Sequence, residues 1–332
     1  MRRVALQFLA LIVAAVATAS CGGERDALTV YSGRGENLVG PLLERYAEET
    51  GVAVDVRYGD SADLALLIAE EGERSPADVF LSQSPGTVGF LAERELLARL
   101  DPALLERVDS TFESDEGLWI GLTARQRVLV YNRDEVPLSE LPRSVFDLVG
   151  PEYRGRVGIA PENASFQDFI SAMRQVAGDD RAREWLRGMA ANDEPTYANN
   201  NAIVEAVGRG EIPMGLVNHY YNVRFLEEDP GLPSRNHVFP AGDLGSIPLA
   251  TTVSELAASD RRAEAARFIE FLLSADSQRF FAEETFEYPL AAGATPATRL
   301  PPLELDELPY DIDRLGGELT ETVRMIEGAG LG

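Results

Sequence analysis

Short apolar runs alternate with longer amphipathic segments along the first hundred residues of this chain. The apolar runs are residues 28–32, 52–59 and 77–82, and a segment with leucines at helical spacing (38–46) is ended by Gly51. Strands that alternate with helices of this length are typical of βαβ units, whose strands form a mostly parallel sheet. The sequence therefore predicts an α/β fold.

Two long apolar runs divide the chain into two parts. The 332 residues exceed what one hydrophobic core usually serves, so two lobes are expected. The run at 119–132 is too extended for an ordinary internal strand, and the run at 246–259 resembles a return crossing. We predict a hinged cleft between two lobes joined by two crossover strands. Lobe 1 comprises residues 28–122 and 250–332, and lobe 2 comprises residues 123–249.

The first 20 residues have the pattern of a signal peptide. Two arginines near the start precede an apolar run at 8–17 and a group of small residues. The only cysteine of the chain, Cys21, follows at once, as in bacterial lipoproteins. We predict that residues 1–20 are removed and that residues 21–27 tether the protein to membrane lipid through Cys21. An uncleaved signal anchor is the alternative, but the run is shorter than the roughly 20 residues that span a bilayer.

The composition excludes several classes of function. The chain has 30 basic and 55 acidic residues and a formal net charge of −25. Such a charge repels nucleic-acid phosphates, so we expect no nucleic-acid partner, and cations are plausible ligands. With its only cysteine, Cys21, committed to the lipid anchor, the chain has no disulfide and no cysteine nucleophile. We expect a monomer.

An enzyme of the cell surface is a rival interpretation from a different class. A serine hydrolase would need a histidine near an activated serine, and no G-x-S-x-G motif occurs. The chain has only two histidines, His219 and His237. His219 with its neighbouring tyrosines as acid and base is the one arrangement left to this interpretation.

Two adjacent tyrosines, Tyr220 and Tyr221, directly follow an apolar strand-like run. Ligands of open α/β sheets bind beyond the carboxyl ends of strands. Both rings reach one ligand only from a turn or a helix start, because successive strand residues point to opposite faces. Phenolate oxygen suits the hard cation Fe(III), which displaces the phenol proton despite an ordinary pKa of about 10. On the dipeptide alone, two packed tyrosines are the simpler interpretation.

Five segments together resemble the bacterial ferric-iron-binding proteins, which have the type II periplasmic-binding-protein fold. The segments are VYSGR (30–34), SPADVF (75–80), ARQRVLVYN (124–132), NHYY (218–221) and ETFEYPL (284–290), and the similarity extends from Leu28 to Leu303. The resemblance implies an extracytoplasmic solute-binding protein, in the periplasm or on the outer face of the membrane, and Cys21 would anchor it to lipid. It would capture Fe(III) with a synergistic anion and deliver the iron to the permease of an ABC importer.

The resemblance also implies an iron ligand set. Tyr220 and Tyr221 match the family's phenolate ligands. Many members add a histidine after the first strand and a glutamate after the third, where this chain has Gly35 and Gln83. The ligand set is therefore incomplete by the family's pattern.

Two further oxygen donors are candidates for the missing ligands. Tyr131 on the first crossover run matches a third tyrosine that the resemblance assigns to other members, and Glu36 follows Gly35. Three phenolates would neutralise Fe(III). The alternative interpretations are a packed aromatic side chain for Tyr131 and a solvated carboxylate at a helix start for Glu36.

The resemblance places an anion such as phosphate, carbonate or citrate beside the iron. A helix beginning near residue 163 would present free N–H groups to it. The candidate anion contacts are Asn163, Ala164, Ser165, Asn200, Asn218, Arg34 and Arg127, with Arg125 near them. Helix caps, turns and surface salt bridges are the alternative interpretation of these residues.

Proteins with the same fold bind thiamine, polyamines, phosphonate or sulfate, and the fold alone does not separate them. Sites for polyamines or thiamine need carboxylates and aromatic walls around a cation. The cleft segments of this chain offer phenols, asparagines and arginines instead. This favours a metal ion together with an anion.

Overall fold

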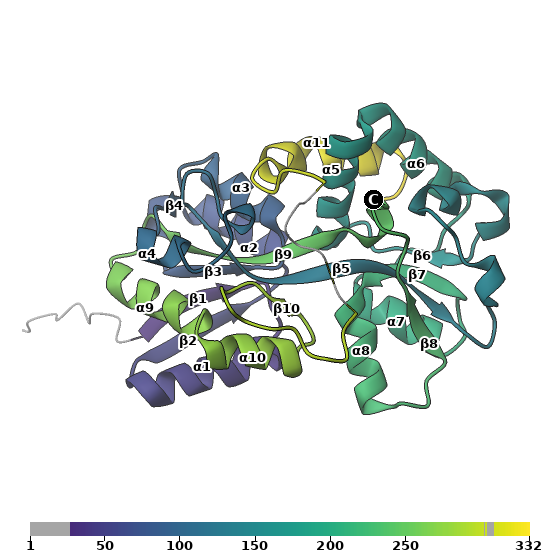
Figure 1. Ribbon diagram of the computed structural model, residues 1–332. Coiled ribbons are helices and arrows are strands. Elements are labelled where there is room, and N and C mark those ends of the chain that lie inside the picture. Colours follow the sequence, from purple (N-terminus) through teal and green to yellow (C-terminus); the bar gives the residue numbers. More distant parts are fainter. Residues whose placement is uncertain (1–26, 302, 304–308) are drawn as a thin grey trace, which may run out of the picture.

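The computed structural model describes residues 27–301, 303 and 309–332 (Figure 1). The predicted signal peptide and Cys21 lie outside the described residues, as does the predicted tether except Ala27. Within the described ranges, no helix combines the length and the apolar character that crossing a membrane requires.

Lobe 1 begins with three parallel strands connected by helices. Strands β1 (Ala27–Ser32), β2 (Ala53–Tyr58) and β3 (Val79–Ser82) lie in the order β2-β1-β3. Helices α1 (Glu36–Thr50) and α2 (Ser61–Glu71) connect them. The periodic leucines of α1 are buried, and Gly51 ends the helix in a left-handed conformation (φ 73°). The predicted α/β class is confirmed.

A long strand, β5 (Ile120–Asn132), belongs to both lobes. Residues 120–126 pair with the antiparallel strand β9 (Pro248–Leu256), which itself pairs with β3. From Arg127 onward β5 pairs instead with β7 (Met214–Asn218). The two predicted domain boundaries fall within β5 and β9. All residues of these two strands are buried, which explains why both runs are long and mostly apolar.

Lobe 2 completes a mixed sheet in the order β2-β1-β3-β9-β5-β7-β6. Strand β6 (Val157–Gly158) is parallel to β7, and β8 (Ser234–His237) is antiparallel to β5. Four helices belong to this lobe: α5 (Ala164–Ala177), α6 (Asp179–Ala191), α7 (Asn200–Gly208) and α8 (His219–Glu228). Figure 1 shows β5 and β9 running between the two groups of strands, consistent with the predicted two-lobe type II fold.

The remaining elements surround this sheet. The remaining helices and strands are α3 (Pro85–Ala92), β4 (Leu97–Ala98), α4 (Pro102–Leu105), α9 (Arg262–Leu272), α10 (Ala275–Glu283), β10 (Tyr288–Pro289) and α11 (Leu315–Gly328). Short 3-10 turns occur at Gly72–Arg74, Ser110–Phe112, Leu138–Glu140, Val145–Val149, Pro151–Tyr153 and Leu244–Ser246.

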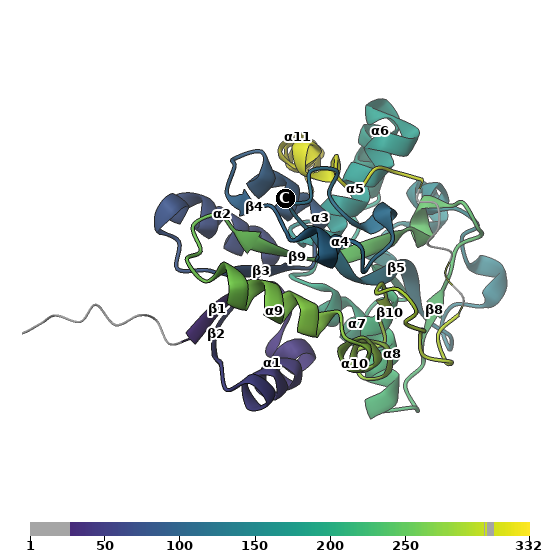
Figure 2. The same ribbon diagram turned by 60° about the vertical axis from the view of Figure 1, so that its left-hand side comes forward.

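The C-terminal helix α11 packs against α3 of lobe 1 and α5 of lobe 2 (Figures 1 and 2). Gly316 of α11 and Gly89 of α3 bring the two backbones into direct contact. A Cβ atom added at Gly316 would lie 2.1 Å from the Cα of Gly89. Only glycine therefore allows α11 to lie this close to α3.

Substitution of Gly316 by alanine is expected to destabilise the fold by about 1 to 3 kcal/mol, because the backbone of α3 has to move aside. Urea unfolding measures this change. Gly328→Ala in the same helix is the matched control, because a Cβ there meets nothing within 4 Å. Equal stability of the two variants would contradict the close-contact explanation.

Candidate functional site

Tyr220 and Tyr221 occupy the first turn of α8, immediately after β7. Their rings are stacked, with centroids 4.1 Å apart and planes 30° from parallel. This agrees with the expectation that adjacent tyrosines share one side only where the strand has ended. Tyr220 is fully buried, and its hydroxyl lies beside the guanidinium of Arg34 but makes no hydrogen bond of good geometry among the described residues.

The environment of Tyr220 keeps its phenol protonated. Burial raises its pKa well above the usual 10, and the neighbouring Tyr221 adds to the shift, whereas Arg34 opposes it. A multiply charged cation at the hydroxyl reverses this preference by stabilising the phenolate. The pair is thus suited to a ligand that brings its own strong positive charge.

Arg34 reaches the tyrosines from lobe 1, where it follows β1. Its Nη2 lies 2.5 Å from Oε2 of Glu287, and both side chains are buried. Its guanidinium carbon lies 5.5 Å from the ring centroid of Tyr220. The candidate site therefore spans the boundary between the lobes.

Two more buried arginines come from the point where β5 changes lobes. Arg125 donates to Oγ1 of Thr251 at 3.2 Å and to the backbone carbonyl of Gln83. Arg127 donates to Oδ1 of Asn218 at 3.3 Å. Burial, together with the nearby charge of Arg125, lowers the pKa of Arg127 to about 9. Three buried guanidinium groups make the region attractive to an anion.

Three of the predicted anion contacts form one hydrogen-bonded cluster at the start of α5. Oδ1 of Asn163 accepts from the backbone N–H of Ser165 at 3.2 Å, from its hydroxyl at 2.6 Å and from Nδ2 of Asn200 at 3.2 Å. Asn163 is thus also the N-cap of the helix. Ala164, the first residue of α5, is buried beside them.

Asn218 lies at the end of β7, next to the tyrosines. Its side chain does not cap α8, and its Nδ2 has no partner among the described residues. Because β6 and β7 are parallel, the loop to α5 and the start of α8 lie at the same edge of the sheet. Arg127 links this edge to α5, since its guanidinium lies 5.4 Å from the ring centroid of Phe169.

Tyr131 and Glu36 are not brought to the tyrosine pair. Tyr131 pairs with Met214 at the start of β7, whereas Arg127 pairs with Asn218 at its end. Four residues of strand separate these positions by about 13 Å. Glu36 is an exposed residue of α1, and its charge acts on Tyr58 instead. Sequence position alone shows neither the strand register of Tyr131 nor the exposure of Glu36.

His219, adjacent to the tyrosines, has both ring nitrogens engaged. Its Nδ1 accepts from the backbone N–H of Gln126 at 3.0 Å, and its Nε2 donates to the carbonyl of Phe286 at 2.7 Å. Burial lowers its pKa to about 4, so the ring is neutral. Through these two hydrogen bonds, His219 connects the crossover strand β5 to lobe 1. Because both ring nitrogens are engaged, His219 is not placed to act as a base, which weakens the enzyme interpretation.

Two buried carboxylates near the site were missed as site candidates. Glu287 lies within the matched segment ETFEYPL, but the resemblance implies no role for this residue. Asp168 on α5 accepts from Oγ of Ser84 at 2.7 Å and from the N–H of Gly86 at 3.2 Å, both in lobe 1. No local pattern marks Asp168, because its partners are distant in sequence.

In the described part of the chain, no three His, Cys, Asp or Glu side chains gather as a metal cage, so a metal site here depends on tyrosine.

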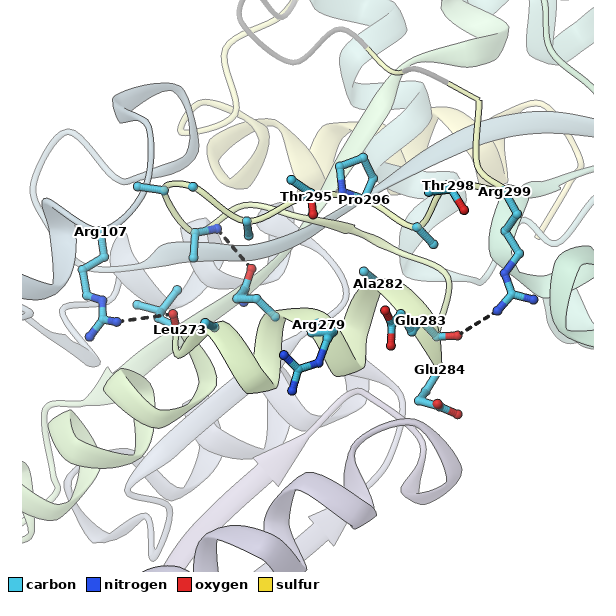
Figure 3. Close-up of a pocket in the computed structure, with 17 residues that line it drawn as sticks. Arg107, Leu273, Arg279, Ala282, Glu283, Glu284, Thr295, Pro296, Thr298 and Arg299 are labelled. Carbon is cyan, nitrogen blue, oxygen red and sulfur yellow. Dashed lines mark hydrogen bonds between the residues drawn. The ribbon is translucent and has the colours of Figure 1, made fainter.

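A separate cavity of about 790 Å³ lies between α10 and the loop 291–299 (Figure 3). None of the predicted site residues lines it. At one end, Arg299 donates to the carbonyl of Glu283 at 3.3 Å and pairs with Glu227 of α8 at 2.5 Å. The cavity is therefore distinct from the tyrosine pair.

Comparisons with known proteins agree on one family. The model of the family described as bacterial extracellular solute-binding protein matches residues 74–310. The Fe(3+)-binding periplasmic protein of Serratia marcescens is 30% identical over 310 residues, which cover 92% of this chain and 90% of that protein.

Two solved structures are similar along nearly the whole chain. Iron-bound HitA from Pseudomonas aeruginosa has a TM-score of 0.88 and 34% identity, covering 92% of this chain and 99% of that one. The Trichodesmium protein IdiA (FutA), in complex with iron and citrate ligands, has a TM-score of 0.78 and 26% identity, covering 92% and 100%.

Proposed function

Because this chain belongs to the bacterial extracellular solute-binding proteins, we propose that it captures ferric iron outside the cytoplasm and delivers it to an ABC importer. The observation that carries the proposal is the buried, stacked pair Tyr220 and Tyr221, with a phenol hydroxyl that has no partner among the described residues. Relatives whose names state that they bind ferric iron support the same cargo.

Iron binding at this pair exchanges phenol protons for a metal ion. The buried phenol of Tyr220 is neutral without iron, because its pKa is raised. Fe(III) supplies enough positive charge to ionise both phenols, and the two phenolates cancel two of its three charges. Protons or reduction to Fe(II) favour release, since both weaken the bond to phenolate.

A small anion is proposed to complete the site. The hydrogen-bonded cluster of Asn163, Ser165 and Asn200, the start of α5 and the free amide of Asn218 supply donors. Arg34 and Arg127 supply positive charge. A relative bound to iron and citrate supports citrate as one candidate, and phosphate and carbonate remain candidates of the same chemistry.

The partners follow from the proposed cargo. We propose that Cys21 carries lipid and holds the monomeric protein beside its permease, where the tether raises the effective concentration. Closure of the lobes about β5 and β9 would trap the iron, and docking on the permease would open them. No catalytic step is part of this proposal.

The three buried arginines favour one other function, a binder of a small anion such as phosphonate without any metal. They argue against thiamine and polyamines, because only Arg34 of the three has an ion-pair partner among the described residues, so Arg125 and Arg127 would repel an organic cation. Binding of methylphosphonate by iron-free protein, measured by calorimetry, would favour this second candidate.

Purified protein mixed with ferric citrate is expected to turn red-orange from phenolate-to-iron charge transfer. The colour should appear with about one iron per protein in elemental analysis, and replacing citrate by phosphate should shift the band, because the anion shares the iron. A colourless protein without bound iron would refute the proposed function.

A further inference from the structure

Glu287 is a buried carboxylate with one oxygen that lacks a partner. The residue is fully buried, and its Oε2 accepts from Nη2 of Arg34 at 2.5 Å and from the hydroxyl of Thr285 at 3.0 Å. Its Oε1 has no hydrogen-bond partner among the described residues. A buried carboxylate oxygen without a partner is costly, so a bound cation is a direct explanation for its position.

Glu287 and Tyr220 belong to one cluster that crosses the lobe boundary. Arg34 connects them, since its guanidinium contacts the carboxylate and lies 5.5 Å from the ring centroid of Tyr220. The carboxylate comes from lobe 1 and the phenol from lobe 2.

The backbone that presents Glu287 has an unusual conformation. The preceding residue, Phe286, has a φ of 57°, in the left-handed region that aromatic residues rarely adopt. Nε2 of His219 holds the carbonyl of Phe286, and the N–H of Glu287 donates to the carbonyl of Phe281 at 3.1 Å. Strain of this kind persists where the surrounding structure enforces it, most often at functional sites.

His219 therefore fixes both sides of the cluster. It is the residue before Tyr220, and its ring is hydrogen-bonded to the residue before Glu287. The single contact sets where the carboxylate lies relative to the tyrosine helix. Such fixed support is what a metal ligand requires, because ligand geometry depends on the residues around it.

We propose that Glu287 is the iron ligand contributed by lobe 1, which binds through Oε1 while Oε2 remains bonded to Arg34. The proposal rests on the proposed function. Two phenolates and this carboxylate carry three negative charges and neutralise Fe(III). The three buried arginines are then left to balance the anion. Because the ligands come from both lobes, iron binding draws the lobes together.

The alternative is that Glu287 only neutralises Arg34. The two roles are separated by a double-mutant cycle with Glu287→Gln, Arg34→Gln and the double variant, in which iron affinity is measured by competition with a chelator. Glutamine keeps the size of the glutamate side chain. The double variant contains neither buried charge, so it avoids an unpaired arginine, and thermal unfolding of each variant verifies folding.

If Glu287 is an iron ligand, Glu287→Gln should lower the iron affinity by the same factor in the unsubstituted protein and in the Arg34→Gln variant. Glu287→Gln should weaken iron binding by more than about 100-fold, which exceeds the 10- to 100-fold typical of supporting residues. The double variant should be weaker than Arg34→Gln by a similar factor, and Glu287→Asp should retain part of the affinity. The charge-transfer band should shift whenever the carboxylate is lost.

Glu284→Gln is the matched control, because Glu284 is an exposed carboxylate three residues earlier in the chain and should leave iron binding unchanged. If the double variant binds iron as tightly as Arg34→Gln, Glu287 is not a ligand, although the protein still binds iron. If the unsubstituted protein binds no iron, the proposed function itself fails.

Discussion

Replacing Tyr220 and Tyr221 together by phenylalanine is expected to abolish the red-orange colour of the iron-loaded protein and its iron binding. The charge-transfer band requires a phenolate bound to iron, and phenylalanine supplies none. Each single variant should keep a weaker, shifted band from the remaining phenolate. Each should also lose more than about 100-fold in affinity, because a lost ligand costs more than the 10- to 100-fold of a lost supporting contact.

The phenylalanine variants should fold normally. Phenylalanine preserves the stacked rings, and the hydroxyl of Tyr220, although it lies beside the guanidinium of Arg34, makes no hydrogen bond of good geometry among the described residues. Removing such a hydroxyl leaves no other group unsatisfied. A loss of colour in these variants is therefore a loss of ligand and not of structure, which thermal unfolding of the iron-free proteins verifies.

Tyr131→Phe is the matched control for this experiment. Tyr131 is also a buried tyrosine, but strand register places it about 13 Å along β5 from the position opposite Asn218. The Tyr131→Phe variant should have the same charge-transfer band and the same iron affinity as the unsubstituted protein. A colour loss in Tyr131→Phe, with none in the Tyr220 and Tyr221 variants, would overturn the assignment of the phenolates.

The second prediction with a large effect concerns Asp168. This residue of α5 in lobe 2 accepts hydrogen bonds from Ser84 and Gly86 of lobe 1. Burial raises its pKa to about 7, although the hydrogen bond from Ser84 and the charges of Arg125 and Arg127 oppose the shift. Tyr310 also faces this carboxylate. The folded protein therefore binds a proton at Asp168 that the unfolded chain releases above pH 3.8. The stability that this proton contributes is complete below pH 3.8 and is lost as the pH rises through about 7.

Asp168→Asn is expected to be more stable than the unsubstituted protein at pH 8, by up to about 4 kcal/mol for a shift of about three pKa units. The advantage should vanish as the pH falls to about 4, because a protonated Asp168 resembles asparagine. Urea unfolding of both proteins between about pH 4 and 8 measures the difference. Glu194, whose pKa burial raises to about 7, titrates in the same range but is present in both proteins and cancels.

Asp55→Asn, at an exposed carboxylate on β2, controls for the removal of one negative charge. A difference between Asp168→Asn and the unsubstituted protein that does not change with pH would show that Asp168 is not the titrating group. A difference that grows with pH supports the uptake of a proton by Asp168 when the chain folds.

Local pattern was enough to predict the α/β class and the crossover strands. The spacing of Leu38, Leu42 and Leu43 gave a buried helix face, and Gly51 ended the helix as expected. These features depend on neighbouring residues and on alternation of strands and helices, which the sequence displays directly. The resemblance further indicated the tyrosine pair, whose rings stack in the fold, and Asn163, Ser165 and Asn200, which the fold joins by hydrogen bonds.

Other features depend on contacts between distant residues, and only the tertiary structure decided them. Arg34 and Glu287 are 253 positions apart, and Ser84 and Asp168 are 84 apart. No periodicity or motif encodes such pairs, because they arise from how two lobes meet. Register likewise separated Tyr131 from the site. The sequence by itself determined the elements and the adjacent tyrosines, whereas the meeting of the lobes decided which buried charges face them.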